Sequence, residues 1–474
     1  MKFPQIIQGG MGAGVSDWRL ARSVSSQGQI GVVSGVALDL ILTRRLQLGD
    51  PGGHMQRALK AFPDQSVARR IIERYFIDGG KPSDQPFARK PMVGHKSNRF
   101  LEQLMVASGF AEVFLAKEGH DGVVGINFLQ KIQAPLLPTL YGAMLAGINI
   151  VLVGAGIPLE IPEVLEAFSH NEPAQLKLYV RDAPRGQSYE SSFDPTSPFD
   201  TPFPAPPRPY FFPIVSSATL AGLLVKKCKG PVDGLIVEGP LAGGHNAPPR
   251  GKTVLSPEGE PLYGDRDAID LPAIKALGLP FFLAGSYSSP ARLQEACSAG
   301  ATGIQVGTLF AFCEESGLAE EIKREAIADC RRGTQSVFTD PIASPTGFPF
   351  KVLSIADSLS EADVYEERSR NCDLGYLREA YLRADGTPAW RCSAENQETY
   401  VRHGGKLEDT VGRKCLCNGL MANIGLPQVR RDKTLERPLV TCGDDLSGIT
   451  RILGPDRSSY RSSDVLDYLL TKES

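Results

Sequence analysis

The residue best placed to do chemistry is His245, in the segment VEGPLAGGHN at 237–246. A run of β-branched apolar residues, predicted to be a strand, gives way here to Gly243 and Gly244. Because glycine has no Cβ, backbone at these positions can approach a flat ligand closely. An imidazole with a pKa of about 6.5 can accept or donate a proton near neutral pH. The segment predicts a ligand pocket with one acid–base group; a structural loop histidine is the alternative.

Two later segments predict a phosphate site. PFFLAGS (280–286) and GIQVGT (303–308) each look like a buried strand that ends in glycine and a hydroxyl residue. If these strands are neighbours, backbone N–H groups at their ends can hold a phosphate. The candidate ligands are Gly285, Ser286, Gly307 and Thr308, with Gln305 on the second strand. The alternative is that the glycines only end strands.

Two further segments supply candidate ligands for a planar ring system. In QGGMGAGVS (8–16), the backbone of Gly9, Gly10 and Met11 follows the first predicted strand. This is not a dinucleotide fingerprint, because no acidic residue ends the next strand. Asn127, at the end of a later strand, could donate from its amide, or be a buried asparagine satisfied by backbone.

Short strands that alternate with helices must position these residues. Eight buried runs lie at 4–8, 30–34, 123–128, 149–154, 211–215, 234–238, 280–285 and 303–307. This order predicts an α/β fold, a (β/α)₈ TIM barrel. A ninth run, KLYV at 177–180, is assigned to a Pro-rich arm instead. Ser16 is expected to cap the first helix.

Three segments interrupt or extend the predicted barrel, which takes residues 1–37 and 120–330. Residues 38–119 predict a helical insertion, which could be a lid, an oligomer contact or, as we favour, a structural elaboration. Residues 182–209 are rich in Pro and Ser and predict an exposed arm. Residues 331–474 form a C-terminal accessory region.

The accessory region contains Cys372, Cys392, Cys415 and Cys417. Four thiolates could bind zinc or an Fe–S cluster, but the spacings are long and the only close pair is CxC. We therefore expect structural cysteines and no metal.

Composition narrows the possible partners. The net charge is −3 and the pI is about 6.2, so no global attraction to nucleic acid or to anionic membranes is expected. No apolar run reaches the length of a membrane span and the N-terminus lacks a signal-peptide pattern, so a cytoplasmic protein with a small-molecule substrate is expected. The sequence does not define the oligomeric state. The motifs of zincins, P-loop proteins and α/β-hydrolases are absent.

Taken in order, QGGMGAGVS, VGINF, VEGPLAGGHN, PFFLAGS and GIQVGTLF resemble the nitronate monooxygenase family, formerly called 2-nitropropane dioxygenases, and related FMN-dependent enoyl reductases. The resemblance covers about residues 1–315. It implies FMN in the barrel, its phosphate at the last two strand ends, and His245 over the flavin as catalytic acid or base. The implied reaction is oxidation of an alkyl nitronate with O₂ to nitrite and a carbonyl compound.

The sequence departs from the family at two places. Ser286 stands where the family's phosphate turn has a second glycine, and 246–249 intervene where many relatives continue with Arg-Gly. The insertion, the arm and the Cys-containing tail resemble trans-acting enoyl reductases of fatty acid and polyketide synthases. That resemblance implies an NAD(P)H-dependent reduction of enoyl thioesters on an acyl carrier protein. A non-catalytic flavin-binding subunit is a third alternative.

Overall fold

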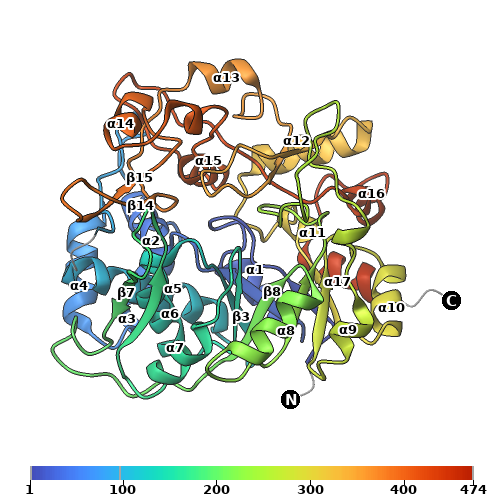
Figure 1. Ribbon diagram of the computed structural model, residues 1–474, viewed down its shortest axis with the longest axis horizontal. Coiled ribbons are helices and arrows are strands. Elements are labelled where there is room, and N and C mark those ends of the chain that lie inside the picture. The colour runs from blue at the N-terminus through green and yellow to red at the C-terminus, as the bar shows by residue number, and fades with distance from the viewer. Residues whose placement is uncertain (1–2, 95–97, 472–474) are drawn as a thin grey trace.

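The computed structural model describes residues 3–94 and 98–471. Eight parallel strands close into a barrel in the order β1-β11-β10-β9-β8-β4-β3-β2. This confirms the predicted (β/α)₈ fold and the assignment of its strands (Figure 1). The barrel strands are β1 (Ile6–Gln8), β2 (Ile30–Ser34), β3 (Val124–Leu129), β4 (Ile150–Gly154), β8 (Tyr210–Val215), β9 (Leu235–Glu238), β10 (Phe281–Ala284) and β11 (Gly303–Val306).

Successive side chains along each strand point alternately into the barrel and away from it, so the core has an interior layer and an outer layer. Ile236 of β9 packs inside the barrel against Phe212 and Phe282, whereas its neighbours Leu235 and Val237 pack outward. Side chains two residues apart share a face of a strand. Glu238 therefore continues the inward-facing row at the carboxyl end of β9.

Helices cover the outside of the barrel. They are α1 (Trp18–Ser25), α6 (Gln133–Leu145), α7 (Ile161–Phe168), α8 (Ala218–Lys227), α9 (Leu271–Lys275), α10 (Pro290–Ser298), α11 (Thr308–Ala311) and α12 (Glu320–Arg332), with a 3₁₀ turn, η1, at Asp265–Asp267. Asp17, and not Ser16, caps α1, accepting from the N–H groups of Arg19 and Leu20. No helix in the described part of the chain is long and apolar enough to cross a membrane.

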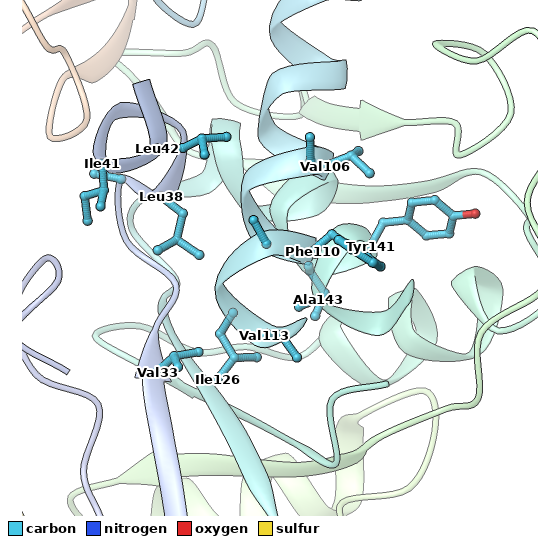
Figure 2. Packing of buried hydrophobic residues seen from close by; sticks show 14 of the residues in the cluster. Val33, Leu38, Ile41, Leu42, Val106, Phe110, Val113, Ile126, Tyr141 and Ala143 are labelled. Carbon is cyan, nitrogen blue, oxygen red and sulfur yellow. The ribbon is translucent and has the colours of Figure 1, made fainter. Parts of the chain in front are cut away.

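Residues 38–119 contain α2 (Leu38–Gln47), α3 (His54–Ala61), α4 (Gln65–Tyr75) and α5 (Arg99–Lys117). Figure 2 shows Val106, Phe110 and Val113 of α5 in the core formed with α2, α6 and the neighbouring strands. A Cβ added at Gly142 of α6 would lie 2.0 Å from the Val106 carbonyl oxygen, so α5 and α6 cross at close range. Such packing makes the insertion an integral layer over this side of the barrel.

The Pro-rich segment is partly an external hairpin. β5 (Ala174–Leu178) pairs antiparallel with β7 (Tyr189–Phe193), outside the barrel, as the exclusion of KLYV from the barrel predicts. The prediction of an exposed arm is wrong for its aromatic residues. Phe199 is buried, and its ring and that of Phe203 pack against Phe62 at the end of α3, because apolar rings exposed to water would be unfavourable.

Most of the C-terminal region lies across one end of the barrel, whereas its last helix packs on the side of the barrel against α1 and α10 (Figure 1). Its helices are α13 (Ala362–Glu367), α14 (Gln397–Arg402), α15 (Leu416–Asn423), α16 (Ser447–Leu453) and α17 (Ser462–Leu470), with a 3₁₀ turn, η2, at Leu407–Thr410. Its strands are β12 (Val337–Asp340), β13 (Phe350–Leu353), β14 (Glu379–Leu382) and β15 (Pro388–Arg391), and β14 also pairs with β6 (Val180–Arg181) of the arm. The domain boundaries themselves stay predictions.

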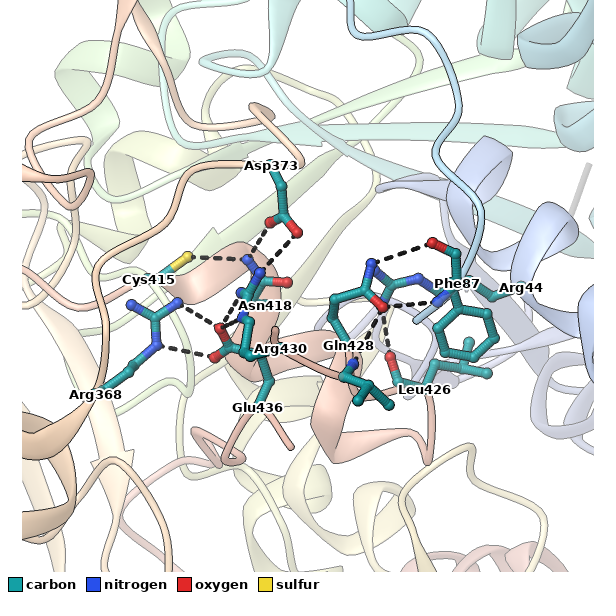
Figure 3. A network of polar contacts seen from close by, with 11 residues as sticks. Arg44, Phe87, Arg368, Asp373, Cys415, Asn418, Leu426, Gln428, Arg430 and Glu436 are labelled. Atoms are coloured by element: carbon teal, nitrogen blue, oxygen red, sulfur yellow. Dashed lines mark hydrogen bonds and ion pairs between the residues drawn. The ribbon is translucent and has the colours of Figure 1, made fainter. Parts of the chain in front are cut away.

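A buried polar network ties this region together (Figure 3). Arg368 and Arg430 both pair with Glu436, and Arg430 also pairs with Asp373 at 2.8 Å. Beside this network, Arg44 of α2 donates to the Leu426 carbonyl. The insertion and the C-terminal region are thus joined in one packed structure.

Candidate active site

A cavity of about 220 Å³ opens at the carboxyl ends of the barrel strands, beneath the C-terminal region. All of the candidate residues from the sequence line it, although they come from five different strand ends. They are Gly9, Gly10, Met11, Asn127, Gly243, Gly244, His245, Gly285, Ser286, Gln305, Gly307 and Thr308. The structure therefore brings the predicted residues together, while their individual roles stay predictions.

The floor of the cavity carries three polar side chains on inward-facing strand positions. Asn127, Glu238 and Gln305 lie at the ends of β3, β9 and β11. Asn127 Oδ1 and Gln305 Oε1 are buried and have no hydrogen-bond partner among the described residues. A buried carbonyl oxygen without a donor is unfavourable, so the floor fits a ligand with N–H groups.

The backbone beside this floor leaves room for a flat ligand only because it is glycine. A Cβ at Gly10 would lie 2.4 Å from the Asn127 Cβ, and one at Gly9 would lie 3.3 Å from Gln305 Cγ. Ser16 fixes this loop, since its hydroxyl bonds both the Gly9 carbonyl and the Met11 N–H at 2.9 Å. Ser16 thus shapes the cavity instead of capping a helix. The backbone of Gly9 and Gly10, which we call the glycine cradle, and the unpaired amide oxygens together fit a planar heterocycle that has N–H groups along one edge.

The two Gly-hydroxyl turns lie side by side, since β10 pairs with β11. Gly285 and Ser286 both have positive φ, at 90° and 61°, a conformation that glycine adopts at less cost than serine. Thr308 Oγ1 accepts a hydrogen bond of 2.9 Å from the Gly443 N–H of the C-terminal region. The described lining of the cavity contains no Lys or Arg, so an anion here would rely on N–H groups and hydroxyls.

One acidic residue, Asp445, lines the same side of the cavity. Its carboxylate accepts from the Ser288 hydroxyl at 2.8 Å and from the Ser447 N–H at 3.0 Å. These hydrogen bonds, opposing the effect of burial, lower the pKa of Asp445. No pattern in the sequence indicates this residue, because it lies more than a hundred residues beyond the last barrel strand.

His245 is held by the C-terminal region. Its Nε2 lies 2.7 Å from Ser344 Oγ, and its ring packs against Phe350 with 4.9 Å between centroids. The Gly244 N–H donates to Thr441 Oγ1 at 3.0 Å. Burial, and to a smaller extent the positive charge of Lys131, lower the pKa of His245 to about 4. The imidazole is therefore neutral at physiological pH.

Glu238 is a candidate that the sequence analysis did not single out, although it stands within VEGPLAGGHN. Its carboxyl has no hydrogen-bond or ion-pair partner in the part of the chain that the structure describes. Burial raises its pKa to about 7. The signal in the sequence was its position, two residues after the inward-facing Ile236.

We expect Glu238→Gln to stabilise the ligand-free protein at pH 8 by up to about 3 kcal/mol, because each pKa unit corresponds to about 1.4 kcal/mol. Below about pH 4.5 the carboxyl is protonated in both folded and unfolded protein, so the two proteins unfold alike. As pH rises to about 7, only the unfolded carboxyl ionises, and the wild type loses stability.

Urea unfolding of both proteins between pH 4.5 and pH 8 measures this difference. Glu258→Gln, at an exposed position, is the matched control and should follow the wild type throughout. A Glu238→Gln protein that also follows the wild type at pH 8 would contradict the prediction.

The other half of the cavity is apolar. The barrel side contributes Val36, Leu129 and Ile132, and the C-terminal region covers them with α15. The apolar side chains from that region are Leu377, Leu416, Leu420 and Met421. A ligand with an apolar portion would be desolvated here.

The four cysteines of the C-terminal region gather in one cluster, with Cys392 and Cys415 buried and Cys372 and Cys417 packed against them. Cys417 also lines the cavity. Within residues 3–94 and 98–471, no group of three or more His, Cys, Asp or Glu side chains is arranged to hold a metal ion. Their structural role stays a prediction.

The nitronate monooxygenase family model matches residues 210–340, which include His245 and both Gly-hydroxyl turns. No curated protein matches the chain. Similar solved structures include FabK from Thermotoga maritima (14% identity, 99% of this chain and 92% of that chain covered, TM-score 0.46). They also include nitroalkane oxidase from Streptomyces ansochromogenes (13%, 99% and 95%, 0.45) and the enoyl reductase domain of MlnA from Bacillus amyloliquefaciens (12%, 98% and 91%, 0.44). The family match confirms the predicted resemblance and the predicted class, an oxidoreductase.

Proposed function

From its resemblance to the nitronate monooxygenase family, we propose that the protein binds FMN at the barrel mouth and oxidises an alkyl nitronate, with His245 as the acid–base group. The observation that carries this proposal is the cavity itself. A glycine cradle, unpaired amide oxygens, two Gly-hydroxyl turns and a neutral imidazole all line one space.

The chain's residues divide between the two ends of the cofactor. Asn127 and Gln305 would accept hydrogen bonds from the ring edge, beside the backbone of Gly9 and Gly10. The phosphate would be held at the Gly285 and Gly307 turns, with Ser286 and Thr308. Bound FMN supplies the redox chemistry, in which electrons from the nitronate pass to O₂ with release of nitrite and a carbonyl compound.

His245 supplies the proton chemistry. With a pKa near 4, its imidazole is unprotonated above about pH 5 and can accept the α-proton of a neutral nitroalkane, which would leave the nitronate in the site. The apolar surroundings exclude water, which strengthens the electrostatic interactions at the imidazole. Because its pKa is lowered, His245 is more suited to accept a proton than to donate one in the free enzyme.

We expect purified protein to show flavin absorbance that is bleached anaerobically by an alkyl nitronate, and restored by O₂ with release of nitrite. The measurement is an absorbance spectrum before and after each addition, with nitrite assayed at the end. NADPH added in place of the nitronate is the control and should leave the spectrum unchanged over the same time. Folded protein that takes up no FMN would overturn the proposal as a whole.

An enoyl-thioester reductase that uses NAD(P)H is the second candidate, and the apolar half of the cavity favours it. Leu416, Leu420 and Met421 of α15 form a cover that a small nitronate does not need and an acyl chain would fill. An acyl carrier protein would then be the partner that delivers the substrate. In the same experiment, bleaching by NADPH and reoxidation by an enoyl thioester would identify this activity. Bound flavin that neither donor bleaches would indicate the non-catalytic alternative.

A further inference from the structure

The two nitrogens of His245 have different surroundings. Nε2 lies 2.7 Å from the Ser344 hydroxyl oxygen. No hydrogen bond joins Nδ1 to any of the described residues, and His245 lines the cavity. An imidazole that is a base at one nitrogen carries its proton on the other, and the partner of that second nitrogen sets the tautomer. The contact with Ser344 therefore bears on which nitrogen meets the substrate.

The Ser344 hydroxyl is completely buried and has three neighbours. Apart from His245 Nε2, Thr346 Oγ1 lies 2.8 Å away, and the Thr346 N–H donates to Ser344 Oγ at 3.2 Å. A hydroxyl has one proton and two acceptor sites. If it accepts from His245 Nε2–H and from the Thr346 N–H, its own proton goes to Thr346 Oγ1, and all three contacts are satisfied.

The backbone holds this arrangement in place from both sides. The Asn246 N–H donates to the Pro349 carbonyl, and the Lys351 N–H donates to the Gly244 carbonyl, each at 3.0 Å. The Ser344 carbonyl accepts from the Arg413 guanidinium at 2.6 Å. The 344–350 segment is thus fixed relative to the Gly-Gly-His turn, and the Nε2 contact is not a chance approach of two mobile side chains.

We propose that Ser344 is a positioning residue that keeps the proton of neutral His245 on Nε2, so that the Nδ1 lone pair faces the cavity as the proton-accepting atom. The proposal rests on the proposed role of His245 as the base. When Nδ1 gains a proton, the Nε2–H bond to Ser344 remains, and the hydroxyl oxygen faces the imidazolium charge. Lys131, the charged group that acts on His245, donates to the Thr346 carbonyl at 3.0 Å and opposes that second positive charge.

The tautomer can be read directly in the holoenzyme without substrate. With ¹⁵N-histidine labelling, NMR shifts should show wild-type His245 protonated on Nε2 and unprotonated on Nδ1 at pH 7. In Ser344→Ala the preference should be lost and both tautomers should appear. A wild-type spectrum with the proton on Nδ1, or a Ser344→Ala spectrum identical to that of the wild type, would overturn the proposal.

Thr346→Val provides a second test that keeps the buried Ser344 intact. Without Thr346 Oγ1 as acceptor, the Ser344 proton should turn to Nε2, and the tautomer should shift towards Nδ1–H. No shift in this variant would contradict the proposed direction of the hydrogen bonds. Ser354→Ala, an exposed serine of the same region, should leave the spectrum unchanged.

Turnover provides the functional readout. We expect kcat of Ser344→Ala to fall about 10- to 100-fold with KM nearly unchanged, because an orienting group acts through the base. Ser344→Thr, which keeps the hydroxyl, should restore most of kcat. Loss of kcat with an unchanged tautomer would reject positioning, whereas the predicted tautomers in a protein inactive with both nitronate and enoyl thioester would reject the proposed function alone.

Discussion

We expect His245→Asn to retain bound FMN and to lower kcat by about 10²- to 10⁴-fold, the range that general acid–base catalysis contributes. Asparagine keeps a polar group of similar reach towards Ser344, so the turn that carries it should still form. It has no basic nitrogen, so the imidazole is lost as a proton acceptor. Steady-state kinetics with the neutral nitroalkane, whose α-proton the base must remove, together with the flavin content of the variant, measures both effects.

His170→Asn is the matched control, since His170 is an exposed side chain just after α7 and is not part of the cavity lining. Its kcat should equal that of the wild type. If His245→Asn turns over the neutral nitroalkane at the wild-type rate with FMN bound, His245 is not the acid–base group. His245 itself should add no inflection to the pH–rate profile near pH 6.5, because its imidazole is already neutral there.

The second large effect is expected at the glycine cradle. Gly10→Val should weaken FMN binding by about 100- to 1,000-fold, equivalent to about 3–4 kcal/mol of overpacking. The first atom of the new side chain would lie 2.4 Å from the Asn127 Cβ and 3.2 Å from Val32 Cγ1. Neither neighbour is the flexible end of a long side chain, so the loop must move away from the cavity floor.

Titration of flavin-free protein with FMN, followed by quenching of flavin fluorescence, gives the dissociation constant. Gly222→Ala in the middle of α8 is the control, because a Cβ there meets nothing within 4 Å. It should bind FMN as the wild type does and be equally or slightly more stable, since alanine favours helix. Unchanged FMN affinity in a folded Gly10→Val protein would place the ring elsewhere.

The sequence predicts those parts of the site that depend on local pattern. The run that ends in Gly243, Gly244 and His245 reads as a strand and a turn without knowledge of any distant residue, and β9 forms there. The same holds for the turns after β10 and β11, because a buried apolar run followed by glycine is a local signal. The closing of eight such strands into a barrel then brings their ends together.

What the sequence does not predict comes from distant segments. Ser344 reaches His245 across 99 residues, and Thr441 reaches Gly244 across 197. A serine in a loop has no periodicity that would indicate its partner. The significance of Glu238 comes from burial without a partner, which only the packed structure shows. The Ser16 and Asp17 pair illustrates a local ambiguity, since both residue types cap helices and the loop geometry selects Asp17.

The contact of the Gly-Gly-His turn with the C-terminal region has a consequence for the order in which the protein is synthesised. A Cβ at Gly243 would lie 2.7 Å from the backbone of Cys442, so the turn is backed by chain made almost two hundred residues later. A nascent chain that has reached Arg332 holds every barrel strand but lacks Ser344, Thr441 and α15. During translation the barrel strands are therefore all present before the Gly-Gly-His turn has the support of Ser344 and Thr441, and the cavity is completed only after these later residues have been made.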